Sequence, residues 1–332
     1  MKTSIEKIAV LGAGAWGTTL AAHLAKKGID VTLWMREEEV KDSITRSREN
    51  TLFLPGVTLP ENLVPTNDLE TSIDGAQMVV GVVPSHGMRG VFSKAAKYIS
   101  EGTIVVNTSK GIEEETGLTG SGILKECSLD KLVVLSGPTF AKEVALGLPC
   151  ALSAAGKNSE DAKVVQVLFS TPTFRVYTNT DIIGVEFGGA LKNVIAVAAG
   201  ISEGLGLGTN ARAALITRGL KEMTGLGVSM GASPETFYGL SGVGDLILTC
   251  TGGLSRNRQV GERIGKGEKL TDIIESMKMV AEGVKTSRAT LKLARREGID
   301  MPVTEEINKV LFDDKPPRKA VMDLMNRELV EE

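Results

Sequence analysis

A glycine-rich turn near the start of the chain constrains the fold more than any other segment. It reads Gly-Ala-Gly-Ala-Trp-Gly over residues 12–17, and it directly follows the apolar run Lys7–Leu11 and opens a helical pattern. Gly12 would permit the tight turn, Gly14 would let the backbone approach a pyrophosphate, and Gly17 would let helix and sheet pack closely. Glycines at this spacing also serve ordinary tight turns, but the strand–turn–helix context favours a dinucleotide site at the helix N-terminus.

Short apolar runs alternate with helical patterns through the first half of the chain. The runs are apolar almost throughout, which is typical of strands buried on both faces of a parallel sheet. The alternation predicts an α/β fold with a doubly wound sheet of the Rossmann type. The expected strands are Lys7–Leu11, Asp30–Trp34, Met78–Pro84, Thr103–Thr108, Leu132–Ser136, Cys150–Ala154 and Phe174–Thr178, and helices are expected at Gly17–Lys27 and Met88–Ile99.

After about residue 180 the strand-like runs end and long helical patterns take over. The sequence therefore predicts a dinucleotide-binding domain over residues 1–182 and an all-helical, substrate-binding C-terminal domain over residues 183–332. Its expected helices are Ile183–Ala199, Asn210–Leu226, Pro234–Tyr238, Arg258–Lys266, Leu270–Ser276, Val284–Glu297 and Pro302–Phe312. The segment Asp313–Arg318 is expected to be a charged, proline-bearing loop.

Charge and composition narrow the classes of partner. The formal net charge is −3 and aromatic residues make up 4% of the chain, so we expect no nucleic-acid partner. The three cysteines, Cys127, Cys150 and Cys250, form no CxxC motif, so we expect neither a disulfide framework nor a metal. The apolar start Ile8–Leu11 is too short for a secretory signal, and no stretch approaches the roughly 20 apolar residues of a membrane span. We therefore expect a cytoplasmic protein without membrane contact.

The end of the second expected strand bears on the choice between cofactors. Arg36 comes first after this strand and Glu37 follows it. A guanidinium suits the 2′-phosphate of NADP, whereas a carboxylate can accept from a ribose hydroxyl of NAD. The order favours NADPH weakly. A solvated charge run remains an alternative.

Polar residues follow three of the expected strands, at the edge where ligands bind in open α/β sheets. Ser85-His86, residues 107–111 with Lys110, and residues 136–141 with Gly137 and Thr139 should converge there. Lys110 would place a cation at the crevice, although it could be an ordinary surface lysine. His86 could act as a general acid or simply pack in its loop.

Two segments of the second half carry further candidates. Lys192 follows Gly188 and Gly189 on a mostly apolar helix, where glycines cost about 1 kcal/mol each relative to alanine. That cost suggests close approach of a ligand or a neighbouring segment, and a lysine there must be paired, reach water or act chemically. Downstream, Asp245 lies in the run 242–250, and Ser255-Arg256-Asn257 stands at an expected helix start. Arginine beside helix N–H groups is a good phosphate receptor.

Together these segments resemble one family, the bacterial-type NAD(P)-dependent glycerol-3-phosphate dehydrogenases. The resemblance rests on GAGAWGTTLA, NTLFLPG, VVPSH, NTSKGIE, SGPTFAKEV, GGALKNV, GLSGVGDLILTC, SRNR and VAEGV, in order from residue 12 to residue 284. It implies a Rossmann-type domain followed by a helical domain. It also implies reversible reduction of dihydroxyacetone phosphate to sn-glycerol 3-phosphate with NADPH or NADH, a supply of glycerol phosphate for phospholipid synthesis, and a homodimer.

The resemblance also assigns site residues. Its cofactor residues fall on Ala15, Trp16, Arg36, Lys110, Ala141, Arg256, Val280 and Glu282, in addition to the glycine turn. Its substrate residues fall on Lys110, Gly137, Thr139, Asp245, Ser255, Arg256 and Asn257, and its proton acceptor falls on Lys192. The family usually has serine where Ala15 stands, so one side-chain hydrogen bond to the cofactor is absent here.

Lys192, Lys110 and Asp245 are the expected catalytic residues. A free lysine has a pKa of about 10.4, so burial and the cations Lys110 and Arg256 would have to lower the pKa of Lys192 for it to act as a base. Asp245 would oppose that shift, which favours an orienting role for it. Two other readings stay open: a related dehydrogenase acting on a hydroxy acid or sugar acid, and a sensor that binds the dinucleotide without turnover.

Overall fold

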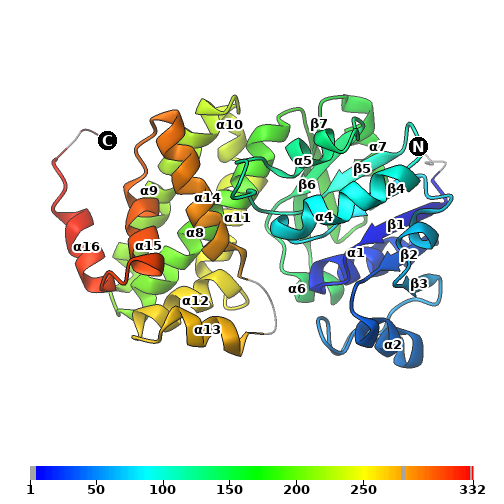
Figure 1. Ribbon diagram of the computed structural model, residues 1–332, viewed down its shortest axis with the longest axis horizontal. Coiled ribbons are helices and arrows are strands. Elements are labelled where there is room, and N and C mark those ends of the chain that lie inside the picture. Colours follow the sequence, from blue (N-terminus) through cyan, green and yellow to red (C-terminus); the bar gives the residue numbers. More distant parts are fainter. Residues whose placement is uncertain (1–4, 278–280, 330, 332) are drawn as a thin grey trace. The chain divides into compact units, whose positions relative to one another are not determined.

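The chain divides into two compact units. A computed structural model describes residues 5–277, 281–329 and 331. Contacts between Cα atoms separate a first unit, Met1–Lys110 with Leu118–Glu186, from a second unit, Gly111–Gly117 with Phe187–Glu332 (Figure 1). By these contacts the first unit ends at Glu186. No pattern in the sequence indicated that residues 111–117 belong with the helical unit.

The first unit is built on a sheet with strand order β3-β2-β1-β4-β5-β6-β7-β8 in the described part of the chain. The first six strands have the order of a dinucleotide-binding fold, and they pair in parallel. The Rossmann-type prediction is therefore confirmed. The strands are β1 (Lys7–Leu11), β2 (Asp30–Trp34), β3 (Leu63–Thr66), β4 (Met78–Gly81), β5 (Ile104–Asn107), β6 (Leu132–Ser136), β7 (Cys150–Gly156) and β8 (Phe174–Asn179).

The sheet departs from the sequence-based expectation at two strands. β7 runs antiparallel to β6, with Ser136 opposite Ser153, a direction that the sequence did not indicate. Because β7 returns beside β6, residues 137–149 form a turn at the carboxyl end of β6. The strand β3 was not expected; it contains Pro65, which is tolerated because β3 lies at the edge of the sheet.

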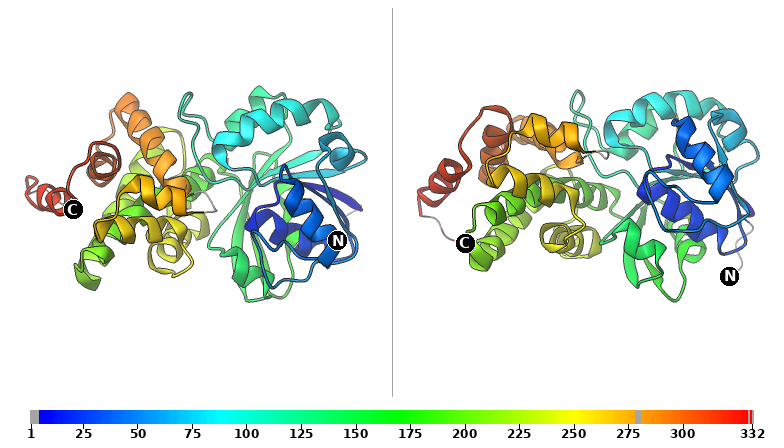
Figure 2. Two further views of the ribbon diagram at one scale, coloured as in Figure 1. Left: turned by 60° about the horizontal axis from the view of Figure 1, so that its bottom comes forward. Right: turned by 90° about the horizontal axis from the view of Figure 1, so that it is seen from below.

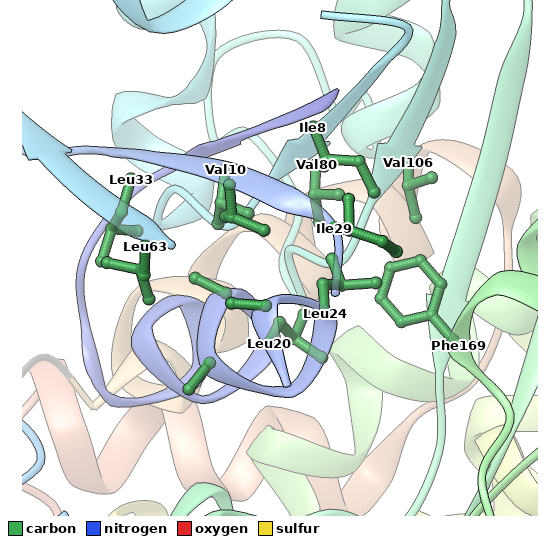
Figure 3. Packing of buried hydrophobic residues seen from close by; sticks show 14 of the residues in the cluster. Ile8, Val10, Leu20, Leu24, Ile29, Leu33, Leu63, Val80, Val106 and Phe169 are labelled. Carbon is green, nitrogen blue, oxygen red and sulfur yellow. The ribbon is translucent and has the colours of Figure 1, made fainter. Parts of the chain in front are cut away.

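Both faces of this sheet are buried, and alternate residues of one strand serve different faces. On β1, Ile8 and Val10 join one apolar cluster with Leu20 and Leu24 of the first helix (Figure 3). Ala9 and Leu11 belong to a second cluster. The helices of this unit are α1 (Ala15–Ala25), α2 (Glu38–Ser47), α3 (Leu69–Ile73), α4 (Ser85–Ala95), α5 (Gly120–Glu126), α6 (Ala141–Ala145) and α7 (Ser159–Phe169), with a 3-10 turn at Ala96–Tyr98.

The second unit is helical, as predicted (Figure 2). Its apolar core includes many residues of α8 (Ile182–Gly204). All seven helices expected from the sequence are present, and two of them have the expected ends. Helices α11 and α16 were not expected. The remaining elements are α9 (Gly208–Ser229), α10 (Pro234–Phe237), a π-helical turn (Leu240–Gly244), α11 (Asp245–Thr251), α12 (Arg256–Gly265), α13 (Leu270–Ser276), α14 (Glu282–Glu297), α15 (Pro302–Phe312) and α16 (Pro317–Met325).

Helix α8 corrects one sequence-based statement. By length and composition it is apolar enough to cross a membrane, so the expectation that no stretch approaches a membrane span is wrong. Within the described residues it is the single helix of this kind, and 89% of its most apolar window is buried inside the protein. The burial identifies α8 as a core helix.

Helices α8 and α12 touch backbone to backbone through glycines on both sides. A Cβ added to Gly200 would lie 2.0 Å from the carbonyl oxygen of Arg258, and one added to Gly261 would lie 2.0 Å from that of Val197. Such distances leave no room for any side chain. The glycines late in α8, which a helix-forming sequence would avoid, are therefore required by this packing.

A buried carboxylate joins α9 to α15. The carboxylate of Glu222 accepts hydrogen bonds from the backbone N–H groups of Val303 (2.6 Å) and Thr304 (3.1 Å) at the start of α15, and from the Thr304 hydroxyl (2.8 Å). Desolvation raises the pKa of Glu222 to about 7, with a smaller contribution from Asp300, and the hydrogen bonds act against this rise.

This raised pKa makes the stability of the protein depend on pH. Below pH 4.5 Glu222 is protonated in both the folded and the unfolded chain, and its contribution is fully present; it is lost as the pH rises through about 7. Between pH 5 and pH 8 we expect the unfolding free energy of the protein to fall by on the order of 2 kcal/mol more than that of Glu222→Gln. Urea denaturation of both proteins at both pH values measures the difference, and equal losses would contradict it.

Candidate active site

The glycine turn has the geometry that a pyrophosphate needs. Gly12 has φ +114°, and a Cβ on it would lie 2.5 Å from the Val82 carbonyl oxygen; a Cβ on Gly17 would lie 1.8 Å from the Gly12 oxygen. Packing within the protein therefore requires both glycines. A Cβ on Gly14, in contrast, meets nothing within 4 Å. Its backbone has an open face, which fits the close approach of a dinucleotide.

The first turn of α1 fits the same ligand. The helix begins at Ala15, and its N-cap Gly14 has no side chain to satisfy the free N–H groups. The indole N–H of Trp16 is buried and has no hydrogen-bond partner among the described residues. Buried donors left unpaired are uncommon and suggest a site that a ligand completes. Thr19 donates to the carbonyl oxygen of Ala141 (3.1 Å), which brings that expected cofactor residue against α1.

Arg36 lies just beyond β2, and its side chain is 85% exposed. It makes an ion pair with Glu37 at 3.1 Å, in contact with solvent. Exposed pairs of this kind contribute little stability, so the guanidinium can exchange partners readily. The position agrees with either cofactor.

Lys110, Gly137 and Thr139 come together at the carboxyl ends of β5 and β6. The Lys110 ammonium donates to the Gly137 carbonyl oxygen at 3.0 Å, and the Thr139 hydroxyl donates to the same oxygen at 3.2 Å. Gly137 has φ +156°, and a Cβ there would lie 2.9 Å from the Leu152 Cα, so only glycine fits. His86 is an exposed residue in the first turn of α4.

In the second unit, Lys192 meets Asp245 across two helices. The Lys192 ammonium donates to Asp245 Oδ1 at 2.7 Å and to the Thr249 hydroxyl at 2.7 Å. Gly188 lies four residues before Lys192, and Ser241 lies four residues before Asp245. A Cβ on Gly188 would lie 2.5 Å from the Ser241 carbonyl oxygen. The close approach at Gly188 thus brings the next turn of both helices together. It explains this glycine as a contact with a neighbouring segment, one of the two reasons expected.

The pair is buried, with Lys192 6% and Asp245 0% exposed. Charges this deep in a protein are stable only when they are paired and hydrogen-bonded. Thr249 was not among the expected site residues. It lies four residues after Asp245 on α11, so helical spacing would have placed it on the same face.

Asn257 connects three elements of the second unit. Its side-chain N–H donates to Asn193 Oδ1 at 2.9 Å, and its side-chain oxygen accepts from the Gly283 N–H at 2.9 Å. A Cβ on Gly283 would lie 2.4 Å from the Asn193 carbonyl oxygen, so α14 begins in direct contact with α8. The sequence did not indicate this connecting contact, and it missed Asn193, the neighbour of Lys192.

The expected helix start at Ser255 is confirmed. Ser255 is the N-cap of α12, and its hydroxyl accepts from the Arg258 N–H at 3.3 Å. Arg256 follows and is exposed. Partial desolvation lowers the pKa of its guanidinium, and the nearby Glu282 carboxylate opposes that effect, so the arginine stays charged at neutral pH. Val280, another expected cofactor residue, lies outside the described residues.

The described residues contain no group of three or more His, Cys, Asp or Glu side chains that could hold a metal ion. A Rossmann-type sheet whose glycine turn has an open face defines the class of dinucleotide-binding proteins, and the buried Lys192–Asp245 pair of the second unit is a candidate for proton transfer.

The comparison with known proteins narrows that class. Residues 7–162 match the N-terminal profile of NAD-dependent glycerol-3-phosphate dehydrogenase, and residues 181–322 match the C-terminal profile. The chain belongs to this family. A glycerol-3-phosphate dehydrogenase [NAD(P)+] from Geobacter sulfurreducens is 56% identical over 328 residues, covering 98% of each chain, and one from Moorella thermoacetica is 51% identical over 322 residues, covering 97% of this chain and 96% of its own.

Solved structures agree with this assignment. A glycerol-3-phosphate dehydrogenase from Coxiella burnetii is similar with a TM-score of 0.94 and 39% identity, covering 97% of this chain and 99% of its own. A ketopantoate reductase from Ralstonia eutropha has a TM-score of 0.61 at 15% identity, covering 95% of this chain and 99% of its own. The second likeness shows a shared fold alone.

The buried pair makes a prediction about stability. We expect Asp245→Leu to lower the unfolding free energy by about 3–5 kcal/mol, because it leaves the Lys192 ammonium buried without its carboxylate. The double variant Lys192→Met with Asp245→Leu should recover most of this loss, since no charge is then left unpaired. Urea denaturation of the three proteins tests this, and a double variant no more stable than Asp245→Leu would refute the pairing energy.

Proposed function

We propose that this chain reduces dihydroxyacetone phosphate to sn-glycerol 3-phosphate with NADH or NADPH, and catalyses the reverse reaction. The observation that carries the proposal is the full-length likeness to a glycerol-3-phosphate dehydrogenase [NAD(P)+] at 56% identity. Each unit contributes a part that such a reaction needs. The first offers a dinucleotide turn, and the second offers a buried ammonium held by a carboxylate.

The reduction needs a hydride at the carbonyl carbon and a proton at the carbonyl oxygen. When bound, the nicotinamide supplies the hydride. Lys192, as an ammonium, donates the proton to the oxygen in reduction and takes it back in oxidation. Asp245 and Thr249 hold the lysine amine in one orientation through hydrogen bonds of 2.7 Å. Their proposed role is to orient Lys192.

The remaining site residues are assigned to binding. Lys110, near Gly137 and Thr139, donates to the substrate and stabilises negative charge on its oxygen. Ser255, Arg256 and the first N–H groups of α12 bind the phosphate. Asn257 fixes the start of α12 relative to α8 and α14, because its amide forms hydrogen bonds with Asn193 and Gly283.

The cofactor residues are assigned on the same basis. The open face of Gly14 and the first turn of α1, with Ala15 and Trp16, take the pyrophosphate. Arg36 takes the 2′-phosphate of NADP and Glu37 can take a ribose hydroxyl of NAD, so NADPH is favoured weakly. Arg256 and Glu282, with Val280, are the other proposed cofactor contacts.

We further propose a cytoplasmic homodimer whose product supplies phospholipid synthesis. The cysteines support a reducing compartment: Cys127, Cys150 and Cys250 are all free thiols, and burial raises the pKa of Cys250 to about 12. A related dehydrogenase of hydroxy acids or sugar acids is the alternative that shares the fold. A sensor without turnover has no need of the buried Lys192–Asp245 pair.

The direct test is the loss of absorbance of the reduced nicotinamide when dihydroxyacetone phosphate is added. We expect turnover with both cofactors, and a higher kcat/KM with NADPH. Arg36→Ala should lower the kcat/KM for NADPH by about tenfold and leave that for NADH nearly unchanged, because one charged hydrogen bond is lost. No turnover of this substrate, with activity on an unphosphorylated hydroxy acid, would favour the alternative enzyme.

Lys192→Met should lower kcat of the folded protein by about 100- to 10,000-fold, because the proton donor is removed. Steady-state kinetics at saturating substrate measure this. Lys285→Met, an exposed lysine on α14, is the matched control and should retain normal kcat. A near-normal kcat for Lys192→Met would end the proposed role of this lysine.

Arg256→Ala should raise the KM for dihydroxyacetone phosphate by about 10- to 100-fold, because a charged hydrogen bond to the phosphate is lost. Arg263→Ala removes an arginine from the same helix that pairs with Glu268, and it should leave KM unchanged. An unchanged KM in Arg256→Ala would remove this residue from the phosphate site.

A further inference from the structure

A second buried carboxylate, Glu186, lies near the start of α8, outside the set of expected site residues. Glu186 is 4% exposed. Its Oε1 accepts from the Asn107 side-chain N–H (2.8 Å) and the Ser121 backbone N–H (2.7 Å). Its Oε2 accepts from the Thr119 and Ser121 hydroxyls, both at 2.6 Å. Four donors fill the accepting capacity of one carboxylate.

No cation pairs with this carboxylate among the residues that the structure describes. Glu186 is thus a buried charge stabilised by hydrogen bonds from neutral groups. Hydrogen bonds to a charged acceptor are about twice as strong as neutral ones, so the arrangement is rigid. The desolvation of a charge is costly, and apolar packing would usually serve stability better. The arrangement therefore serves position better than stability, and the groups that Glu186 holds in place become relevant.

The hydrogen bonds of Glu186 continue to Lys110. Asn107 ends β5, and its side-chain oxygen accepts from the Ser109 N–H at 3.0 Å while its N–H group donates to Glu186. Ser109 precedes Lys110, whose ammonium donates to the Gly137 carbonyl oxygen. The amide of Asn107 therefore has one end on the carboxylate and the other on the loop that bears the lysine.

The space around the Asn107 amide is tightly filled. Asn107 is 0% exposed, and a Cβ on Gly120 would lie 2.2 Å from its side-chain nitrogen. The start of α5 therefore approaches this amide so closely that residue 120 must be glycine. With Glu186 on one side and Gly120 on the other, the amide has one orientation.

The same carboxylate holds the chain where it leaves the first unit. The chain departs after Lys110, returns at Leu118 and departs again after Glu186. Asn107 lies shortly before the first of these points, Thr119 and Ser121 lie shortly after the second, and Glu186 is itself the third. One side chain therefore fixes the first-unit end of every connection to residues 111–117 and to the rest of α8.

We propose that Glu186 is a positioning residue for Lys110: through Asn107 it fixes the backbone of residues 107–110, and so the site from which the lysine reaches the substrate. The inference rests on the proposed function, because it requires Lys110 to bind the substrate. The proposed role of Glu186 concerns Lys110 and does not involve the glycine turn, where the dinucleotide pyrophosphate is proposed to bind.

The chemistry of the four donors supplies a sharp pair of variants. Glu186→Ala leaves all four without an acceptor. Glu186→Gln can keep every bond: its oxygen accepts from the Asn107 and Ser121 N–H groups, and its amide N–H groups donate to the Thr119 and Ser121 hydroxyls, which can turn to accept. Hydrogen-bond geometry, rather than charge, is then what the glutamine preserves.

We expect Glu186→Ala to lower kcat/KM for dihydroxyacetone phosphate by about 100-fold, since a misplacement near 1 Å costs about that much. The Kd for NADPH, measured by nicotinamide fluorescence, should change much less than kcat/KM, because Lys110 is one of several expected cofactor residues and the glycine turn is untouched. Glu186→Gln should stay within about threefold of the wild type on both measures. A value of kcat/KM in Glu186→Ala within about threefold of the wild type would overturn the proposal, as would equal losses in both variants.

A matched control separates positioning from general destabilisation. Glu222→Ala removes another buried glutamate that accepts three hydrogen bonds at a helix start, and it should lower the thermal midpoint while leaving the kinetic constants of the folded protein unchanged. In a Lys110→Met background, Glu186→Ala should cause little further loss, because two residues acting through one lysine are not additive. Full additivity would show that Glu186 acts elsewhere.

If Glu186→Ala does not fold, Asn107→Ala breaks the same connection at its other end and carries the same expectation. Normal kinetics in that variant would also overturn the proposal. The wild-type assay distinguishes the two levels of the argument. A wild type that fails to turn over dihydroxyacetone phosphate would contradict the proposed function. An active wild type together with normal kinetics in Asn107→Ala would contradict only the role of Glu186.

Discussion

The pairing of a buried ammonium with a buried carboxylate constrains the whole second unit. Lys192 and Asp245 are 6% and 0% exposed, and neither could be buried as an ion without the other. Their hydrogen bond of 2.7 Å joins α8 to the start of α11. Gly188 lies one turn earlier on α8, where a Cβ would meet the Ser241 carbonyl oxygen at 2.5 Å. The ion pair therefore lies next to a close backbone contact between the same two segments.

Much of the first unit could be predicted because its signals are local. A strand, a glycine turn and a helix follow one another within residues 7–25. Each predicted apolar run is long enough to be recognised as a strand from the sequence. The strand β3 could not be read, because four residues with Pro65 resemble a loop until a neighbouring strand pairs with them. The reversal at β7 depends on where the chain returns in space, and no local pattern encodes that.

The residues of the candidate site likewise fall into those that the sequence could predict and those that depend on distant partners. Lys110, Gly137 and Thr139 were expected together because parallel strands end at one edge of a sheet, and the structure brings them together. Thr249, Asn193 and Glu186 escaped attention because each gains its meaning from a partner more than 50 residues away in the chain. Polar residues on an apolar helix are the signal that could have found the last two.

Helix α8 carries its functional residues at set angular positions. Glu186 accepts from Asn107 and Ser121 at one end of this segment, Gly188 contacts Ser241 in the middle, and Lys192 reaches Asp245 one turn later. Each residue of an α-helix turns the chain by about 100°, so one inserted or deleted residue between these positions would swing the later ones to another face. The seven residues from Glu186 to Lys192 must therefore keep their number if both contacts are to form.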